Sequence, residues 1–309
     1  MSTPSPDHPA RHSSGLVRNA RNFSQLVKLG HTIFGLPFAL AAAVLAHGLA
    51  TAQGHEGLTW ARFGLIVLAF AGARASAMGF NRIVDRRFDA LNPRTADREI
   101  PRGAISVPIA TAFTVLSAAV FVGSAVALGP VPAMLAVPVL VMLLGYSLFK
   151  RFSWTSHLAL GVALALAPGG AFVAVSGGFD HWWVPLPLMF AVATWVAGFD
   201  VLYSLADADF DRANGLHSIP ARFGIRGALW ISALLHVATV GALVFLHVSV
   251  GLGVAHLAGV GLIAAILVYE HWIVRPSDLS RLGKAFFDLN GYVAIAYLVA
   301  TLVDRLVLA

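Results

Sequence analysis

The chain has 309 residues, of which 58% are hydrophobic and only 12% are charged, whereas a soluble globular domain carries about 25% charged residues. This composition excludes an ordinary water-soluble protein and indicates a chain that lies mostly within a lipid bilayer. Cysteine is absent, so disulfide bridges and thiolate sites are excluded, and a metal ion would need oxygen or imidazole ligands.

The first 30 residues form a polar N-terminal tail without the apolar core of a cleavable signal peptide. Residues 31–309 are expected to form a single transmembrane domain, because stretches of about 20 apolar residues, the length that a bilayer demands of a helix, recur along it. The nine predicted spans are 31–50, 63–82, 107–127, 131–149, 156–176, 184–204, 227–247, 252–273 and 286–307. We therefore predict an all-α, polytopic membrane protein with nine transmembrane helices.

Lysine and arginine are distributed unequally between the two sides of these spans. All of the 21 basic residues except Arg62, Arg74 and Arg305 lie in the N-terminal tail or in the even-numbered connections. Because cytoplasmic connections of membrane proteins are rich in Lys and Arg, the tail and these connections are predicted to face the cytoplasm. The net charge of +6 is thereby explained by topology, so we expect membrane lipid and no nucleic acid as a partner.

Polar residues, most of them acidic, recur at intervals of three or four positions in two places on the predicted cytoplasmic side, and these are called the acidic groups. The first group is Asn81, Asp85 and Asp89, and the second is Asp200, Tyr203, Asp207 and Asp211. Residues four apart share one face of a helix, and carboxylates at the edge of hydrocarbon are unfavourable unless something neutralises them. Magnesium in proteins is typically held by a few carboxylates together with substrate phosphates, so the two groups predict a magnesium–diphosphate site.

The less specific alternative is a pair of solvated helix ends whose acids form ion pairs with Arg86, Arg87 and Arg212. Arg94 and Arg98 follow the first acidic group, and Lys150 follows Tyr146 by four residues. A guanidinium fork suits phosphate oxygens, although cytoplasmic connections are basic in any membrane protein.

Other polar residues near the predicted helix ends are His31, His157, Asp288 and Asn290. We interpret His31 as an interfacial anchor, His157 as a helix-packing residue, and the other two as interhelical hydrogen-bond partners.

Taken together, the motif Asn81-x-x-x-Asp85-x-x-x-Asp89, the residues Arg94, Arg98, Tyr146 and Lys150, and the motif Asp200-x-x-Tyr203-x-x-x-Asp207-x-x-x-Asp211 resemble the UbiA prenyltransferase superfamily. The resemblance covers essentially the whole chain. It implies helices around a central cavity, capped on the cytoplasmic side by the two long connections. It also implies a location in the bacterial inner membrane, with the N-terminus and the active site facing the cytoplasm.

The resemblance further implies an enzyme that moves a polyprenyl group from its diphosphate to a ring carbon of an aromatic acid. Two magnesium ions would be held by Asp85, Asp89, Asp207 and Asp211, and the substrates would be bound by Asn81, Arg94, Arg98, Tyr146, Lys150, Asp200 and Tyr203. One position departs from the family pattern, because Arg82 stands directly after the motif asparagine, where the commonest pattern has aspartate.

Two functional questions stay open at the level of the sequence. The acceptor is expected to be of the 4-hydroxybenzoate type, with a hydroxynaphthoate as the alternative. A membrane transporter is the alternative from another class of protein, but its acidic residues should lie near the middle of the membrane, whereas the acids here gather at the predicted cytoplasmic ends.

Overall fold

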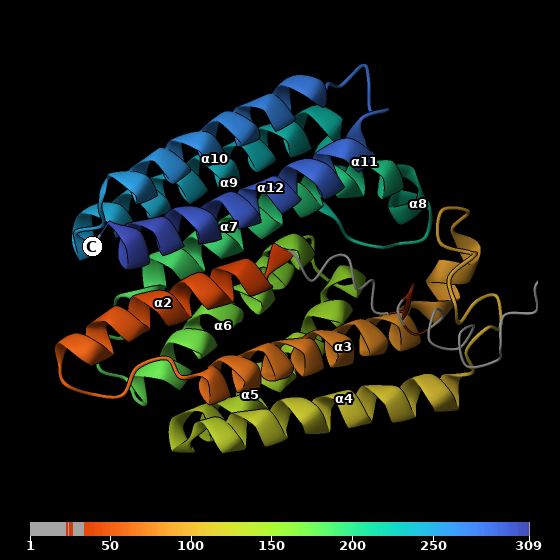
Figure 1. The fold of residues 1–309 in the computed structure, drawn as a ribbon. Coiled ribbons are helices and arrows are strands. Elements are labelled where there is room, and N and C mark those ends of the chain that lie inside the picture. The colour runs from red at the N-terminus through yellow and green to blue at the C-terminus, as the bar shows by residue number, and fades with distance from the viewer. Residues whose placement is uncertain (1–22, 24, 27–33, 309) are drawn as a thin grey trace, which may run out of the picture.

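The computed structural model describes residues 23, 25–26 and 34–308. In this part of the chain all regular structure is helical, and Figure 1 shows long helices running side by side in alternating directions. The long elements are α2 (Leu36–Ala52), α3 (Trp60–Leu91), α4 (Val107–Leu128), α5 (Pro130–Gly145), α6 (Ser156–Ser176), α7 (Pro185–Ser204), α9 (Ile219–Val250), α10 (Val254–Ile273) and α12 (Asn290–Leu302).

Short helical segments extend several of these elements. They are the 3-10 turns η2 (Tyr146–Arg151) and η3 (Leu205–Asp207), the helices α8 (Ala208–Ala213) and α11 (Leu282–Lys284), and the π-helical segments η4 (Ala285–Leu289) and η5 (Val303–Val307). Together the described residues form eight helices long and apolar enough to cross a bilayer, and α2 is a shorter apolar helix of 17 residues. The prediction of an all-α membrane protein is confirmed. The first predicted span begins at residues outside the described part of the chain.

Two predicted helix boundaries differ clearly from the structure. The sequence predicts that the second span ends at residue 82, but α3 continues to Leu91. The polar residues after position 82 can continue the α3 helix because one face of α3 packs against protein and not against lipid. The seventh span is predicted to begin at residue 227, but α9 begins at Ile219 and is interrupted at Gly224, whose φ of 71° is left-handed.

Small residues bring neighbouring helices close together. A Cβ on Gly72 of α3 would lie 2.8 Å from the backbone nitrogen of Phe121 in α4, and a Cβ on Gly161 of α6 would lie 2.2 Å from the carbonyl oxygen of Ala193 in α7. Helix association in a bilayer depends on such close backbone packing, because lipid offers no hydrophobic driving force between helices. The tight pairs leave the side chains on the other faces of α3 and α6 free to border a cavity.

The interior is filled by apolar side chains of helices α2, α6, α7, α10 and α12, with Trp195 and Tyr297 among its largest fully buried residues. At one end of the bundle, α8, α11 and the connection after α3 lie together, and the α2–α3 connection lies at the opposite end (Figure 1). The first of these ends carries both acidic groups and is called the polar end below.

Candidate active site

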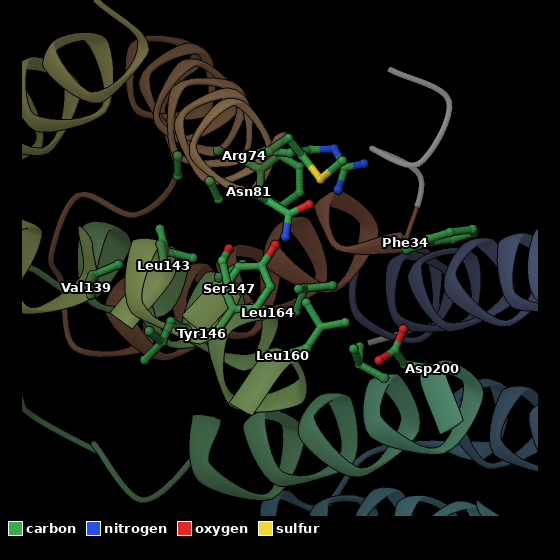
Figure 2. A pocket seen from close by; sticks show the side chains of 18 of the residues that line it. Phe34, Arg74, Asn81, Val139, Leu143, Tyr146, Ser147, Leu160, Leu164 and Asp200 are labelled. Carbon is green, nitrogen blue, oxygen red and sulfur yellow. The ribbon is translucent and has the colours of Figure 1, made fainter. Parts of the chain in front are cut away.

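A cavity of about 690 Å³ runs through the bundle, and all eleven residues proposed from the sequence border it. They are Asn81, Asp85, Asp89, Arg94, Arg98, Tyr146, Lys150, Asp200, Tyr203, Asp207 and Asp211. Figure 2 shows Asn81, Tyr146 and Asp200 around the same space, although they come from three different elements. The volume lies within the range of small-molecule binding pockets.

The first acidic group lies on one face of α3. Residues Ile66, Phe70, Ala77 and Asn81 of this helix border the cavity, and the same face continues to Asp85 and Asp89. This is the helical periodicity that the four-residue spacing predicts. Apart from Arg74, which also borders the cavity, the helix therefore carries an apolar lining along most of the bundle and turns polar where it reaches the polar end.

Each carboxylate of this first group has a basic partner. The Asp85 side chain accepts a hydrogen bond of 2.9 Å from Nδ2 of Asn81, and Nη2 of Arg151 lies 3.1 Å from its Oδ1. Nη1 of Arg98 lies 2.6 Å from Oδ1 of Asp89, which is buried. The other oxygen of Asp89, Oδ2, is buried without a hydrogen-bond partner among the described residues.

Asp207 joins the two acidic groups through the connection that follows α3. Its Oδ1 accepts hydrogen bonds of 2.9 Å from Nδ2 of Asn92 and from Nε of Arg94, and Arg94 Nη2 bonds its Oδ2. Arg94 also donates to the Tyr203 hydroxyl at 2.7 Å and lies over the Tyr203 ring, 4.7 Å from its centre. Burial acts to lower the pKa of Arg94, but the hydrogen bonds and negative charge of Asp207 outweigh it and raise this pKa above its usual value.

The second acidic group does not lie on one continuous α-helix. After Ser204 the chain tightens into the 3-10 turn η3 and then forms α8, yet Asp207 and Asp211 both border the cavity. Asp211 is fully buried, and Nζ of Lys150 lies 2.8 Å from its Oδ1. The change of helix type moves residues off the regular four-residue face, which the spacing alone did not predict.

Asp200 is hydrogen-bonded to His157, which is predicted from the sequence to be a helix-packing residue. Nδ1 of His157 lies 2.7 Å from Oδ2 of Asp200, and the His157 Nε2 accepts a hydrogen bond of 3.3 Å from the backbone nitrogen of Ile219. The imidazole is therefore held between α7 and the start of α9, and it borders the cavity. His157 therefore contacts Asp200 in addition to packing between helices.

The arrangement balances four acids with four basic side chains. The pairs are Asp85 with Arg151, Asp89 with Arg98, Asp207 with Arg94, and Asp211 with Lys150. Three of these basic residues, Arg94, Arg98 and Lys150, are predicted from the sequence to bind an anion. The alternative partners Arg86, Arg87 and Arg212 form none of these pairs, and Arg212 contacts exposed Asp209 instead, at 2.9 Å.

The donor set is suited to a metal ion that is completed by substrate oxygens. No group of three or more His, Cys, Asp or Glu side chains in the described residues is arranged to hold a metal by itself. Magnesium does not require one, because it keeps several waters and commonly uses one or two carboxylates with phosphate oxygens. Oδ2 of Asp89 and Oδ2 of Asp211 are buried and lack hydrogen-bond partners in the described part of the chain. Both oxygens are therefore available to coordinate a cation.

Beyond the polar end, apolar and aromatic side chains line the cavity. Phe286 of η4 stacks on Tyr203 with ring centres 4.1 Å apart, and Phe199 meets Phe286 edge-on at 5.4 Å. Phe34 packs against both phenylalanines. An apolar wall of this kind excludes water and presents aromatic faces to any cation formed inside.

Several contacts of the site were not predicted from the sequence. Asn92 and Arg151 contact Asp207 and Asp85, and His157 contacts Asp200. Arg151 follows Lys150 directly and Asn92 lies three residues beyond Asp89, so sequence position was a usable signal for both. No such signal exists for Phe286, because the sequence holds 20 phenylalanines of similar appearance.

The position that departs from the family pattern lies away from the cavity. Arg82 is buried with 3% of its surface exposed and is not among the residues that border the cavity. It lies on α3 one residue beyond Asn81, and therefore points in a different direction from the lining face. His31 and the N-terminal tail up to residue 22 lie outside the described residues.

Comparisons with known proteins identify a family for this chain. The model of the UbiA prenyltransferase family matches residues 35–292. The chain is 30% identical over 226 residues to the 4-hydroxybenzoate octaprenyltransferase of Citrobacter koseri, covering 72% of this chain and 75% of that protein, and 25% identical over 292 residues to the one of Vibrio campbellii, covering 93% and 98%.

Solved structures agree at the level of the fold. The apo structure of a UbiA homolog from Aeropyrum pernix K1 is similar with a TM-score of 0.80 and 35% identity, covering 89% of this chain and 98% of that chain. A UbiA homolog from Archaeoglobus fulgidus, solved with DMAPP and Mg²⁺, is similar with a TM-score of 0.66 and 20% identity, covering 89% and 99%. With its family model matched over most of its length, the chain belongs to the UbiA prenyltransferase family.

Proposed function

We propose that the protein transfers a polyprenyl group from its diphosphate to a ring carbon of an aromatic acid, most directly 4-hydroxybenzoate. The observation that carries this proposal is the division of one cavity into two parts. Four aspartates and four basic side chains gather at the polar end, and apart from Arg74 the side chains that line the rest of the cavity are mostly apolar. A lipid-soluble chain with a diphosphate head has the same division of polarity.

The relatives support both the reaction and the donor. The proteins of Citrobacter koseri and Vibrio campbellii are named for octaprenyl transfer to 4-hydroxybenzoate. The Archaeoglobus fulgidus homolog of similar fold binds DMAPP or GPP together with Mg²⁺. Transfer of these properties to the present chain is our proposal, and the residues at the polar end suit a magnesium–diphosphate head.

In this proposal Asp85, Asp89, Asp207 and Asp211 hold two magnesium ions. Bound magnesium supplies positive charge that neutralises the diphosphate as a leaving group. The protein's own part begins with Arg94, Arg98 and Lys150, whose cationic groups lie at the cavity and offer hydrogen bonds to diphosphate oxygens. These groups are preorganised by their contacts with the aspartates, so little reorganisation is needed when charge develops.

The reaction breaks the allylic carbon–oxygen bond of the donor and forms a carbon–carbon bond to the acceptor ring. The ring proton then leaves, and a carboxylate or the released diphosphate accepts it. The apolar wall around Phe199 and Phe286 keeps water away from the allylic cation. Tyr146 and Tyr203 border the chamber, and Asn81 orients Asp85 through its hydrogen bond.

The acceptor is tested with a panel of compounds. Purified protein is incubated with a labelled prenyl diphosphate and either 4-hydroxybenzoate or a hydroxynaphthoate, and prenylated products are separated. Transfer to 4-hydroxybenzoate is expected. Transfer to a hydroxynaphthoate alone would show that the acceptor is a hydroxynaphthoate. Transport of a substrate without diphosphate release would show that the protein is a transporter and not an enzyme.

The metal ligands are tested by substitution. Asp85→Asn and Asp207→Asn are expected to abolish diphosphate release while membrane insertion stays intact, because each removes a carboxylate at the cavity without changing side-chain volume. A chelator should abolish turnover in the wild-type protein, and magnesium should restore it. Asp209→Asn is the matched control, since Asp209 lies in the same short helix as Asp211 with a fully exposed side chain. Full activity of either site variant would contradict the proposed metal site.

A further inference from the structure

The cavity continues well beyond the polar end, to the opposite end of the bundle. Its lining includes Leu128 at the end of α4, Pro132 near the start of α5, and Trp182 in the connection between α6 and α7. Because neighbouring helices run in opposite directions, these three residues lie at the end of the bundle away from the acidic groups. The cavity is therefore long enough for side chains at different positions along α6 to contact different parts of a bound prenyl tail.

Helix α6 borders the cavity along one face. Ala163, Ala167, Gly170 and Ala174 all contribute to the lining, and their spacing of four, three and four residues places them on one side of a helix. A Cβ added to Gly170 would have no heavy atom within 4 Å, so the space in front of it is open.

The neighbouring glycine has a different environment. A Cβ on Gly169 would lie 2.6 Å from Sδ of Met189, so Gly169 is packed against α7. Both glycines follow Pro168, which lies inside α6 and removes a backbone hydrogen-bond donor there. Close packing explains glycine at position 169, but it does not explain glycine at position 170.

The distance between Gly170 and the polar end follows from the helix itself. His157, on the same helix, is hydrogen-bonded to Asp200 and marks the polar end. Gly170 lies thirteen residues further along α6, which corresponds to about 20 Å at about 1.5 Å per residue. Four carbon–carbon bonds in extended form give about 5 Å per isoprenoid unit, so a tail that starts near Asp200 reaches Gly170 at about its fourth unit.

We infer that Gly170 determines donor specificity by leaving the cavity open for prenyl tails longer than about four isoprenoid units. This inference rests on the proposed function, because it concerns the tail of the same donor. Glycine provides the opening since any larger side chain at this position would project into the path of the tail. Short tails end before this level and do not meet the residue.

The test compares a short and a long donor in one assay. Wild-type protein, Gly170→Ala and Gly170→Leu are purified in the same detergent and assayed with geranyl and octaprenyl diphosphate, magnesium and 4-hydroxybenzoate. Gly170→Leu is expected to lower the ratio of octaprenyl to geranyl turnover about tenfold or more, since a misplaced side-chain volume in an apolar pocket discriminates by such factors. Gly170→Ala should shift the ratio in the same direction by less.

Gly123→Leu is the matched control. Gly123 lies in α4 at a similar depth from the helix start, has no atom within 4 Å of an added Cβ, and does not border the cavity. The ratio for this variant is expected to equal that of the wild-type protein. Retained geranyl turnover in Gly170→Leu shows that this variant is folded.

The possible failures are distinguishable. If the wild-type protein uses both donors and the ratio is unchanged in Gly170→Leu, the inference is overturned and the proposed function stands. Equal loss of turnover with both donors in Gly170→Leu, with normal activity in Gly170→Ala, also overturns it. If the wild-type protein uses neither donor, the proposed function is contradicted, and the inference that rests on it is contradicted as well.

Discussion

Among single residues, the site depends on which basic side chain faces which carboxylate. Arg94 contacts Asp207 with two nitrogens and Tyr203 with a third. Only a planar guanidinium presents donors in this arrangement, whereas a lysine ammonium offers a single point charge. The identity of residue 94 therefore matters beyond its charge.

Arg94→Lys is expected to lower kcat/KM for the prenyl diphosphate about tenfold or more, because hydrogen bonds to charged groups contribute about 1.5–3 kcal/mol. Steady-state measurement of diphosphate release checks this expectation. Arg212→Lys serves as the control, since Arg212 contacts Asp209 at the protein surface and surface ion pairs contribute little. Equal activity of Arg94→Lys and wild-type protein would show that residue 94 acts only through its charge.

Between helices, a buried polar network fixes the segment that presents Phe286 to the cavity. Trp195 of α7 donates to Oδ1 of Asn290 at 2.7 Å, and Nδ2 of Asn290 donates to Oε1 of Glu270 in α10 at 3.0 Å. The expectation of interhelical hydrogen bonds is confirmed for Asn290. It is wrong for Asp288, whose side chain is exposed and has no hydrogen-bond partner on another helix among the described residues. Asn290 directly follows the π-helical segment η4 that contains Phe286, and π-helical turns often occur at functional sites.

Asn290→Leu is expected to lower the free energy of unfolding by about 2 kcal/mol or more, since it leaves the Trp195 indole and the Glu270 carboxyl buried without this partner. Thermal unfolding in detergent measures the change. Asp288→Asn is the control, because Asp288 lies two residues away on the same segment but is exposed. A melting temperature of Asn290→Leu equal to that of the control would contradict a stabilising role for the network.

Across the molecule, the polar end and the α2–α3 connection lie at opposite ends of the bundle (Figure 1). The distribution of Lys and Arg predicts that the polar end faces the cytoplasm. A chain without cysteine allows this orientation to be tested with single introduced thiols.

Asp209→Cys and Glu56→Cys place thiols at the polar end and in the α2–α3 connection, where the native side chains are 100% and 74% exposed. In intact cells a membrane-impermeant maleimide is expected to label Glu56→Cys and to leave Asp209→Cys unlabelled until the membrane is opened. The reverse pattern would invert the topology, and labelling of both in intact cells would contradict a two-sided arrangement.

The amino-acid order alone was sufficient to predict the membrane environment, the helical class and eleven of the residues that border the cavity. Spacing along a helix and the length of apolar stretches are local properties, so they assign Asp85 and Asp89 to one helix face without any knowledge of the neighbouring helices. The motif order also identified Asp207 and Arg94 as members of one site, although it did not identify them as partners.

Which residues meet across the bundle depends on the packing of the helices. The pairing of Arg94 with Asp207 spans 113 positions of the chain, and the four-residue spacing did not predict the 3-10 turn η3 that contains Asp207. The packing of α6 against α7 distinguishes Gly169, where an added Cβ would meet Met189, from Gly170, where an added Cβ would face open space, although both residues border the cavity. These contacts depend on how distant helices approach each other, and a pattern read along one helix contains no information about the helix that packs against it.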